Sequence, residues 1–478
     1  MKGKMKKRTK VVGGITFLSV ALFIGSCSQG FDVNESFSSG VSNAQLESPA
    51  SEKIIFSKVP GSDTPQEQVA WPVVHGAGGY LFTLYNMDDP ANPVKLYTDT
   101  IDGVSTIFQY DDDTNYKVEL TTLGDAKQNN KDALTASVAS WSSLVPATVI
   151  PDGTDLFQYF NENPIPADTT QYAYEMVENG HYTASGDLNF GAVMVTLRGT
   201  KVNPPILTMD GSFVSTGGGM IVKYMTVVKT SNAPFISYSS SPDNSFNYNG
   251  TGVYVSVGRE QTVQQCNVYG LASEFITANG KKYGFESLSC LNSHIFLAPD
   301  VNASMMFNLN QSFIVHLNVK NSTFADPSLY NKANVSYAMQ LGNNRPDKYG
   351  YGKGDVTATI DHTTFYGLAG KGNFFNTGQA LSQDGNTLVF TNNLFYESGN
   401  SNTYGKFGSG SAHSKMKASG NAWYWSDSSI TTGDGNNPIT VNPGFAALDP
   451  SSNPATWAFV PTASDIVTAQ CGDTSWYN

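Results

Sequence analysis

One short motif recurs along the second half of the chain and limits the folds that are open to it. The motif is an apolar residue, a turn-forming residue two positions later, and another apolar or aromatic residue three positions beyond. Its copies begin at Val222, Val263, Cys290, Val319, Ile360, Phe390 and, in a weaker form, Ala418. The last positions of successive copies are 41, 27, 29, 41, 30 and 28 residues apart. Such spacing is typical of a repeated structural unit with insertions in two of its loops.

The motif predicts stacked coils in which two short strands meet at a sharp bend. Each strand would send one apolar side chain inward, and the bend residue would need an unusual backbone conformation, which Asn tolerates. The bend positions of the six clear copies are Tyr224, Gln265, Asn292, Asn321, His362 and Asn392. Parallel ladders between coils would bury a continuous apolar column. We therefore interpret His362 as a bend residue, in preference to a catalytic histidine.

The bend asparagines resemble those of pectate-lyase-like right-handed parallel β-helices, which implies that fold for residues 147–478. The opening coils, from Gly180 to Gly199, resemble those of pectinesterase-like β-helices, but the catalytic Asp and Arg motifs of pectinesterases have no counterpart. A short helix after Asp155 is expected to close the near end of the stack. Trp457 and Trp476 are expected to cap its far end.

Residues 52–146 show a different pattern, with apolar residues at every second position. Tyr80, Phe82 and Leu84 form one such run, and the stretch from Tyr116 to Leu120 forms another. Alternating runs separated by turns indicate a small β-sandwich. The segment resembles a fibronectin type III domain, so the expected fold class is all-β, with this sandwich preceding the β-helix.

The N-terminus resembles a bacterial lipoprotein signal peptide over residues 1–26. Six basic residues precede an apolar run, and Gly and Ser stand before Cys27, which would carry the lipid. Residues 27–51 are small and polar, which predicts a flexible tether. An ordinary signal peptide or an uncleaved anchor is the alternative. Residues 28–478 resemble uncharacterised polysaccharide-utilisation lipoproteins of Bacteroides-type bacteria. That resemblance implies an outer-membrane lipid anchor and a glycan-import transporter as partner.

Charge and cysteine content narrow the partners further. The chain has a formal charge of −12. Because the signal segment is basic, the rest of the chain has a more negative net charge. Such an acidic body repels nucleic acid, and it would repel an acidic polysaccharide unless a local basic cleft existed. Cys266 and Cys290 lie about one coil apart, so they either pair or stay as buried thiols. No cysteine spacing fits a zinc site. We expect no cofactor, and calcium only if the protein is a lyase.

Two surfaces are candidates for binding. The residues that follow the inward positions should point outward, and an aromatic row there would stack sugar rings unless loops cover it. This row consists of Tyr269, Phe296, Ala325, Tyr366, Tyr396 and Tyr424. The second surface is loop 343–355, which is basic and aromatic and is either a glycan contact or an ordinary surface loop. Its candidate residues are Arg345, Lys348, Tyr349, Tyr351 and Lys353.

The leading hypothesis for function is a non-catalytic protein that binds polysaccharide, including uronate-containing glycans. The first alternative is a polysaccharide lyase, in which Arg345 would neutralise a uronate carboxylate and Lys348 would act as the base. After the signal segment the chain has only two further arginines, Arg198 and Arg259. The second alternative is a structural or adhesive envelope protein.

Overall fold

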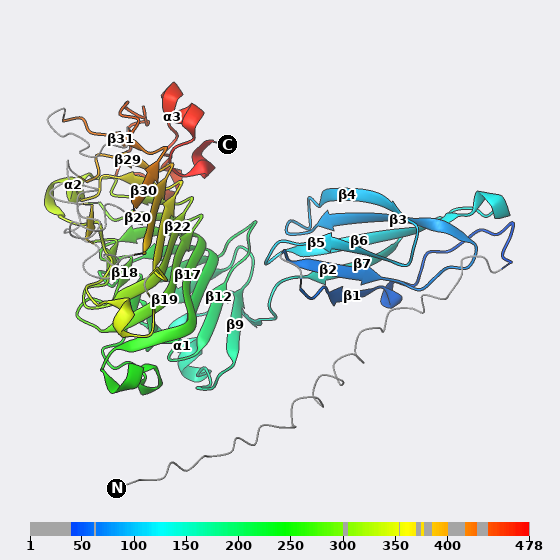
Figure 1. Ribbon diagram of the computed structural model, residues 1–478, viewed down its shortest axis with the longest axis horizontal. Coiled ribbons are helices and arrows are strands. Elements are labelled where there is room, and N and C mark those ends of the chain that lie inside the picture. Colours follow the sequence, from blue (N-terminus) through cyan, green and yellow to red (C-terminus); the bar gives the residue numbers. More distant parts are fainter. Residues whose placement is uncertain are drawn as a thin grey trace, which may run out of the picture. The chain divides into compact units, whose positions relative to one another are not determined.

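The computed structural model describes residues 40–61, 64–299, 305–352, 354–369, 374–376, 385–399, 416–427 and 438–477. The signal segment, Cys27 and Lys353, for which the sequence makes predictions, lie outside these ranges. The chain divides between Val145 and Pro146 into two compact units, termed unit 1 and unit 2 (Figure 1). No helix in the described ranges combines the length and the apolar character that a membrane crossing requires.

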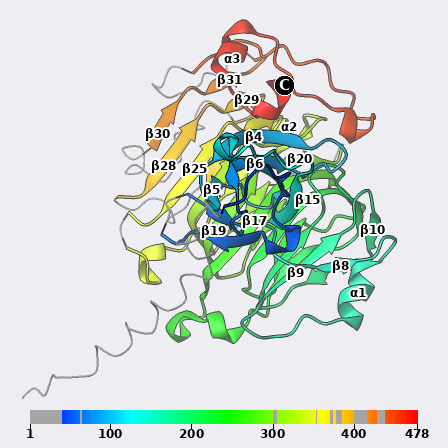
Figure 2. The same cartoon turned by 90° about the vertical axis from the view of Figure 1, so that its right-hand side faces the viewer.

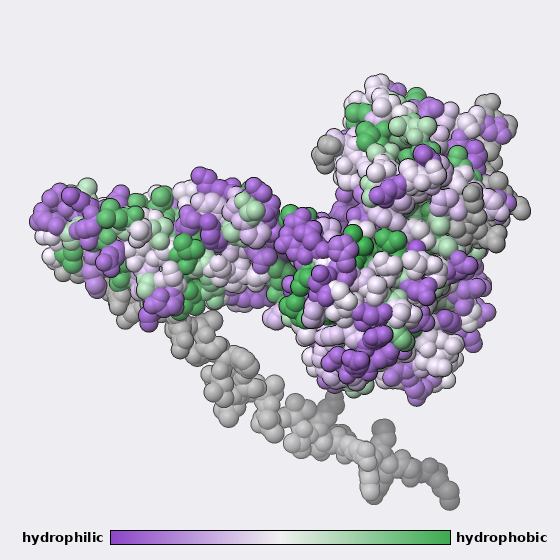
Figure 3. All heavy atoms as spheres, turned by 180° about the vertical axis from the view of Figure 1, so that it is seen from behind, coloured by the Kyte–Doolittle hydropathy of each residue, from purple (hydrophilic) through white to green (hydrophobic). Residues whose placement is uncertain are grey.

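Unit 1 consists of two antiparallel sheets around one core. The first sheet contains, in spatial order, β1 (Ile55–Lys58), β2 (Gln66–Ala70) and β5 (Ser105–Gln109). The second contains β4 (Val94–Ile101), β3 (Ala77–Asn86), β6 (Asn115–Gly124) and β7 (Ser137–Ser142). The two alternating runs of the sequence are confirmed as strands with a buried face, since Phe82 and Val118 are fully buried with Trp71 between the sheets. Apolar side chains on the surface are interspersed with polar ones over the face drawn in Figure 3.

The predicted tether ends earlier than expected. Residues 41–50 pack against unit 1, where Leu46 is buried and the Asn130 side chain accepts a 3.0 Å hydrogen bond from the Ala44 amide. A backbone bridge joins Gln45 to Lys131. The reason is that the isolated apolar side chains in this polar stretch find cover on the sandwich, which composition alone does not reveal.

Unit 2 is built from coils that contribute a strand before the bend and a strand after it, and many of them also contribute a short third strand. Strands before the bend are β8 (Thr148–Ile150), β9 (Gln171–Met176), β12 (Met194–Arg198), β19 (Tyr283–Leu291), β22 (Phe313–Lys320), β25 (Thr357–Asp361), β28 (Thr387–Thr391) and β30 (Met416–Ser419). Strands after it are β10 (His181–Ala184), β13 (Ile206–Met209), β20 (His294–Leu297), β23 (Thr323–Ala325), β26 (Thr364–Tyr366), β29 (Leu394–Tyr396) and β31 (Ala422–Tyr424). β15 (Met220–Lys229) and β17 (Tyr254–Leu271) run through the bend.

The short third strands form a separate parallel sheet of seven strands. These are β11 (Leu188–Asn189), β14 (Phe213–Ser215), β16 (Ile236–Tyr238), β18 (Ile276–Thr277), β21 (Phe307–Asn308), β24 (Met339–Gln340) and β27 (Phe375–Asn376). The other strands of unit 2 form a parallel sheet of seventeen strands. In it, strands of successive coils such as β25, β28 and β30 lie side by side (Figure 2). The chain is therefore all-β with long parallel sheets, an arrangement consistent with the expected parallel β-helix.

Helices are few and short in the described ranges. The α-helices are α1 (Leu156–Glu162), α2 (Tyr330–Asn334) and α3 (Ser464–Ala469). Single 3₁₀ turns are η1 (Ser51–Lys53), η2 (Ala126–Gln128), η3 (Asn244–Phe246), η4 (Tyr248–Gly250), η5 (Pro346–Lys348), η8 (Pro454–Thr456) and η9 (Thr474–Tyr477). The predicted helix after Asp155 is confirmed as α1, because the Asp155 carboxylate accepts hydrogen bonds from the amides of Phe157 (2.9 Å) and Gln158 (3.2 Å). Leu156 and Phe160 join the buried core at that end of the stack.

The register predicted from the motif is confirmed in every copy. Val222 pairs with Val263, and the ladder continues in order through Cys290, Val319, Ile360, Phe390 and Ala418. All six bend residues have the left-handed conformation, with φ of 60°, 48°, 50°, 46°, 46° and 55° from Tyr224 to Asn392. The inward side chains form one continuous core, as the stacking argument requires.

The three cysteines of unit 2 are free and buried. Of the two alternatives for Cys266 and Cys290, the structure shows separate thiols. The Cys266 thiol donates a weak hydrogen bond to the carbonyl of Val222 at 3.5 Å. Burial raises the pKa of Cys266 to about 12, so it stays protonated and acts as a small apolar residue of the core.

Candidate functional site

The outward aromatic row is in register but is covered by the C-terminal strap, defined as residues 438–477. Tyr366 stacks on Tyr396 with ring centres 4.7 Å apart, and Tyr396 stacks on Tyr424 at 5.7 Å. Tyr366 is only 7% exposed because Phe459 of the strap packs against it at 5.3 Å. Of the two alternatives for the row, the structure shows the covered one at Tyr366, since packing an apolar row against another segment removes it from water. Tyr396 and Tyr424 stay half-buried.

The strap also differs from the predicted cap. Trp457 and Trp476 lie along the side of the stack, where Trp457 packs against Phe296 at 5.5 Å and Trp476 against His294 at 4.6 Å. Both contacts are to β20, several coils before the end. The strap therefore shields one lateral face of unit 2.

Loop 343–355 turns its rings toward the coils. Tyr349 stacks on Phe313 with ring centres 5.3 Å apart, and Tyr351 packs edge-on against the same ring at 6.0 Å. Burial raises the pKa of Tyr351 to about 12. Arg345 forms two hydrogen bonds with Asp347, at 2.6 and 3.0 Å, so its guanidinium already neutralises a carboxylate of its own loop. Lys348 is exposed in the same turn.

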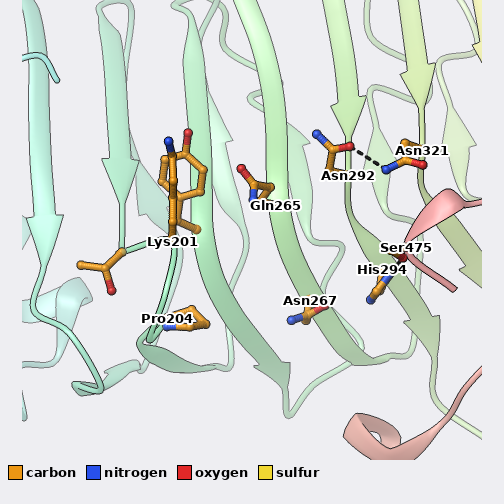
Figure 4. A pocket seen from close by; sticks show the side chains of 10 residues that line it. Lys201, Pro204, Gln265, Asn267, Asn292, His294, Asn321 and Ser475 are labelled. Carbon is orange, nitrogen blue, oxygen red and sulfur yellow. Dashed lines mark hydrogen bonds between the residues drawn. The ribbon is translucent and has the colours of Figure 1, made fainter. Parts of the chain in front are cut away.

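A different surface is hollowed along the bend residues, and we term it the bend groove. It comprises two adjoining pockets, of about 370 and 480 Å³, that share Asn292 and Asn321. The first is also lined by Thr200, Lys201, Pro204, Tyr224, Gln265, Asn267, His294 and Ser475. The second is also lined by Leu291, Asn318, Lys320, Asp361, His362 and Thr474. Figure 4 shows how successive strands present the side chains of the first pocket to the same side.

The repeat itself explains why the groove is polar. Each left-handed bend places one side chain on the outside of the stack, so amides follow one another at the coil spacing. The Asn321 amide donates to the Asn292 carbonyl oxygen at 2.8 Å (Figure 4), and the Thr474 backbone amide donates to the Asn321 side chain at 2.8 Å. From Lys201 to His362 the groove crosses five coil spacings of about 4.8 Å each, or roughly 24 Å.

Cationic side chains outnumber free carboxylates in the groove. Lys201 and Lys320 line it, and Lys201 lies over the Tyr224 ring at 5.7 Å. Its one lining carboxylate, Asp361, accepts a hydrogen bond from the Thr391 hydroxyl at 2.5 Å and lies 3.1 Å from the imidazole of His362. Two lysines and one carboxylate thus line the groove, so an acidic polymer would meet more cationic than anionic side chains there.

His294 and Ser475 line the groove and contact the buried Asp473 behind them, but the geometry of the three residues is not that of a catalytic triad. The Nε2 atom of His294 lies 3.1 Å from the Asp473 carboxylate and 3.2 Å from the Ser475 hydroxyl. In a triad these partners would use different ring nitrogens. The Ser475 hydroxyl instead donates to Asp473 at 2.7 Å. Burial would raise the pKa of Asp473, but hydrogen bonds from His294 and Ser475 outweigh it and hold that pKa below its ordinary value.

The sequence did not identify the groove as a site, although part of the signal was present. The repeat locates the bend positions, and Lys320 stands one residue before the bend residue Asn321. The sequence therefore places Lys320 beside the ladder of bend residues. Ser475 and Thr474 could not have been found, because no local pattern brings the strap onto these coils.

Comparison with known proteins identifies two sequence families. Residues 1–182 match DUF4992 and residues 180–326 match DUF4957, and both are described as domains of unknown function. The first match continues past the boundary between the two units, into β10. No curated protein matches the chain.

A solved structure that matches is the pectate lyase PelI from Erwinia chrysanthemi in complex with tetragalacturonic acid. The identity is 8%, and the match covers 63% of this chain and 87% of the lyase chain with a TM-score of 0.14. At that score the similarity supports no argument about fold detail or ligand, so function rests on the geometry of the bend groove.

Proposed function

We propose that this protein is a cell-envelope lipoprotein that binds polysaccharide, including uronate-containing glycans, along the bend groove. The observation that carries the proposal is a run of regularly spaced amides flanked by Lys201 and Lys320. Side-chain amides both donate and accept hydrogen bonds, as sugar hydroxyls do, and lysines pair with carboxylates. Repeated weak contacts along one polymer would add up through avidity.

Binding is favoured over lyase chemistry because a side chain that the lyase would need is already paired within the protein. The predicted neutraliser Arg345 is already paired with Asp347. In the groove, Lys320 and Asn318 both line the second pocket, and a lyase would need one such side chain as base and another as neutraliser. A structural or adhesive role predicts no affinity for any glycan.

Replacing both Lys201 and Lys320 with glutamine is expected to weaken binding of uronate polysaccharides by tenfold or more. Loss of two charge-assisted contacts worth about 1.4 kcal/mol or more in sum gives that change. Affinity electrophoresis in gels that contain pectin, alginate or a glycosaminoglycan measures it, using the full-length protein in detergent. Lys282→Gln, which removes one exposed lysine outside the groove, is the control and should migrate like wild type.

Three results would contradict this assignment. Unretarded migration in every glycan would favour the structural role. Rising ultraviolet absorbance from unsaturated products would favour the lyase. An equal loss of retardation in Lys348→Gln would move the site to loop 343–355.

We propose that Cys27 carries the lipid, on the basis of the signal-like segment before it. A lipidated chain should enter the detergent phase in Triton X-114 partitioning, and the Cys27→Ser chain should move to the aqueous phase. If both chains partition alike, the anchor is not at Cys27. An outer-membrane location and a transporter partner are parts of the same proposal.

We also propose that unit 1 is a fibronectin type III-like spacer between anchor and coils. Its sheets of three and four antiparallel strands support this. So does Tyr116 near the start of β6, whose hydroxyl accepts a 2.7 Å hydrogen bond from the Asp111 amide, as in the tyrosine corner of such sandwiches.

A further inference from the structure

A second cavity of about 550 Å³ lies on unit 2 away from the bend groove. Its polar lining comes from Thr169, Gln171, Arg259, Glu260, Glu286 and Ser287. None of these residues lines the bend groove. On β17, Glu260 precedes the bend residue Gln265 by five residues, or roughly 16 Å of strand. We term this cavity the bulge pocket.

An irregularity in β17 creates the pocket. The pairing of β17 with β19 shifts between Ser256 and Glu260, and Gly258 within that stretch has a φ of 66°. A bulge of this kind turns side chains out of their regular positions, which brings Arg259 to the pocket wall. The Gly258 amide donates to the Glu286 carboxylate, which ties the bulge to the next coil.

The absence of a side chain at Gly219 leaves room for Met194, which lines the pocket. Gly219 lies between Met194 and Glu260 on neighbouring coils. A Cβ atom at this position would come within 2.0 Å of the Met194 sulfur and 3.0 Å of the Glu260 carbonyl oxygen. Met194 is an apolar residue of the pocket lining, and a side chain at position 219 would displace it.

Arg259 is the feature of the pocket that points to a ligand. Its side chain is half-buried, yet it makes no hydrogen bond or ion pair with any residue in the described ranges. By contrast, Arg198 is paired with Glu175 at 2.7 Å and Arg345 with Asp347 at 2.6 Å. A partly desolvated guanidinium without acceptors is unfavourable, and a bound ligand would supply them.

The two carboxylates define which ligand fits. The Glu286 carboxylate accepts a hydrogen bond from the Gly258 amide, and the Glu260 carboxylate accepts one from the Thr262 hydroxyl at 3.3 Å. Each carboxylate can accept further hydrogen bonds. An anionic ligand would be repelled by the carboxylates of Glu260 and Glu286. A cationic ligand would be repelled by the guanidinium of Arg259. A hydroxyl group can accept from Arg259 and donate to a glutamate at the same time. Hydroxyls of Thr169 and Ser287 and the amide of Gln171 add further partners.

We propose that the bulge pocket binds a neutral pyranose sugar, with Arg259 donating to the sugar hydroxyls and Glu260 and Glu286 accepting from them. Its volume lies in the range of small-ligand sites. This site is independent of the acidic-polymer groove, because the two cavities share no residue and differ in charge.

The test is titration calorimetry on the full-length protein in detergent, with glucose, galactose and mannose and with glucuronate and glucosamine as charged probes. At least one neutral sugar should bind, and each charged probe should bind at least tenfold more weakly. Arg259→Gln should reduce the neutral-sugar affinity by tenfold or more, and so should Glu286→Gln. Lys95→Gln, an exposed charge in unit 1, should change nothing.

The outcomes separate this proposal from the groove. The double lysine variant of the bend groove should keep neutral-sugar binding, and Arg259→Gln should keep retardation by uronate polymers. Equal thermal midpoints for wild type and variants would show that the fold is intact. The proposal is overturned if none of the three neutral sugars binds, if glucuronate or glucosamine binds as well as the neutral sugars, or if Arg259→Gln or Glu286→Gln binds like wild type.

Discussion

Replacing Phe365 with alanine is expected to destabilise unit 2 by about 3–5 kcal/mol. Phe365 is fully buried, and its ring lies 5.7 Å from Phe324, 4.9 Å from Phe395 and 4.8 Å from Phe374. Three coils therefore meet at this ring. Removing it leaves a cavity whose walls belong to separate parallel ladders, so collapse of one wall would strain the next coil.

The effect is measured by denaturant unfolding followed by near-ultraviolet circular dichroism. The midpoint for unit 2 should fall, while the transition of unit 1 should not move. Val467→Ala, which truncates a side chain that is 41% exposed on α3, is the matched control and should cost less than about 0.5 kcal/mol. If Phe365→Ala were as stable as the control, the column of aromatic residues would not be what stabilises the stack.

The register of unit 2 could be predicted from sequence because every coil must solve the same local problem. A two-strand bend needs a residue that tolerates positive φ and an inward apolar residue on each side. Those demands fall at fixed spacing within each copy, so Asn292 or Asn392 can be located without knowing any neighbour. The resulting ladder, Val268 to Ile295 to Phe324, then follows from stacking alone.

The covering of the aromatic row was not predictable in the same way. An outward row of tyrosines has the same pattern whether it faces water or another segment, because strand alternation reports only which face a residue is on. The strap that covers it shares no repeat with the coils. Its docking depends on contacts such as Phe459 on Tyr366, which join residues nearly a hundred positions apart.

The two cavities differ in how far the sequence reveals them. The bend groove consists largely of the bend residues and of residues that flank them in the repeat. Its amides and Lys320 can therefore be located from the sequence once the repeat is known. The bulge pocket depends on an irregularity at Gly258 and on the missing side chain of Gly219 in the neighbouring coil. Neither glycine breaks a pattern that the sequence makes visible, because both lie within the long gap before Val263 or at the edge of a copy.

Replacing Asp473 with alanine is expected to release the C-terminal strap and to lower stability by about 3–5 kcal/mol. Asp473 is 1% exposed, and its carboxylate accepts hydrogen bonds from the Thr323 hydroxyl at 2.8 Å and from Ser475, besides its contact with His294. Its loss leaves the fully buried Thr323 hydroxyl without this acceptor and removes the contacts that hold His294 and Ser475 together. Without the strap, Tyr366 and Phe296 would face water.

Strap release should be visible as increased binding of the dye ANS, together with a lower unfolding midpoint. Asp465→Ala, an exposed acid on α3 of the same strap, is the control and should increase dye binding little. Dye binding that rises equally in both variants would show that the strap is not held by Asp473.

The pH dependence of the same carboxylate gives a second readout. Its pKa is lowered in the folded state, so its stabilisation is present above the ordinary aspartate value and is lost as pH falls through the lower folded-state value. The stability difference between wild type and Asp473→Asn should therefore be constant at neutral pH and shrink below about pH 4. A difference that persists undiminished into strong acid would mean that the ionised carboxylate is not what holds the strap against the aromatic row.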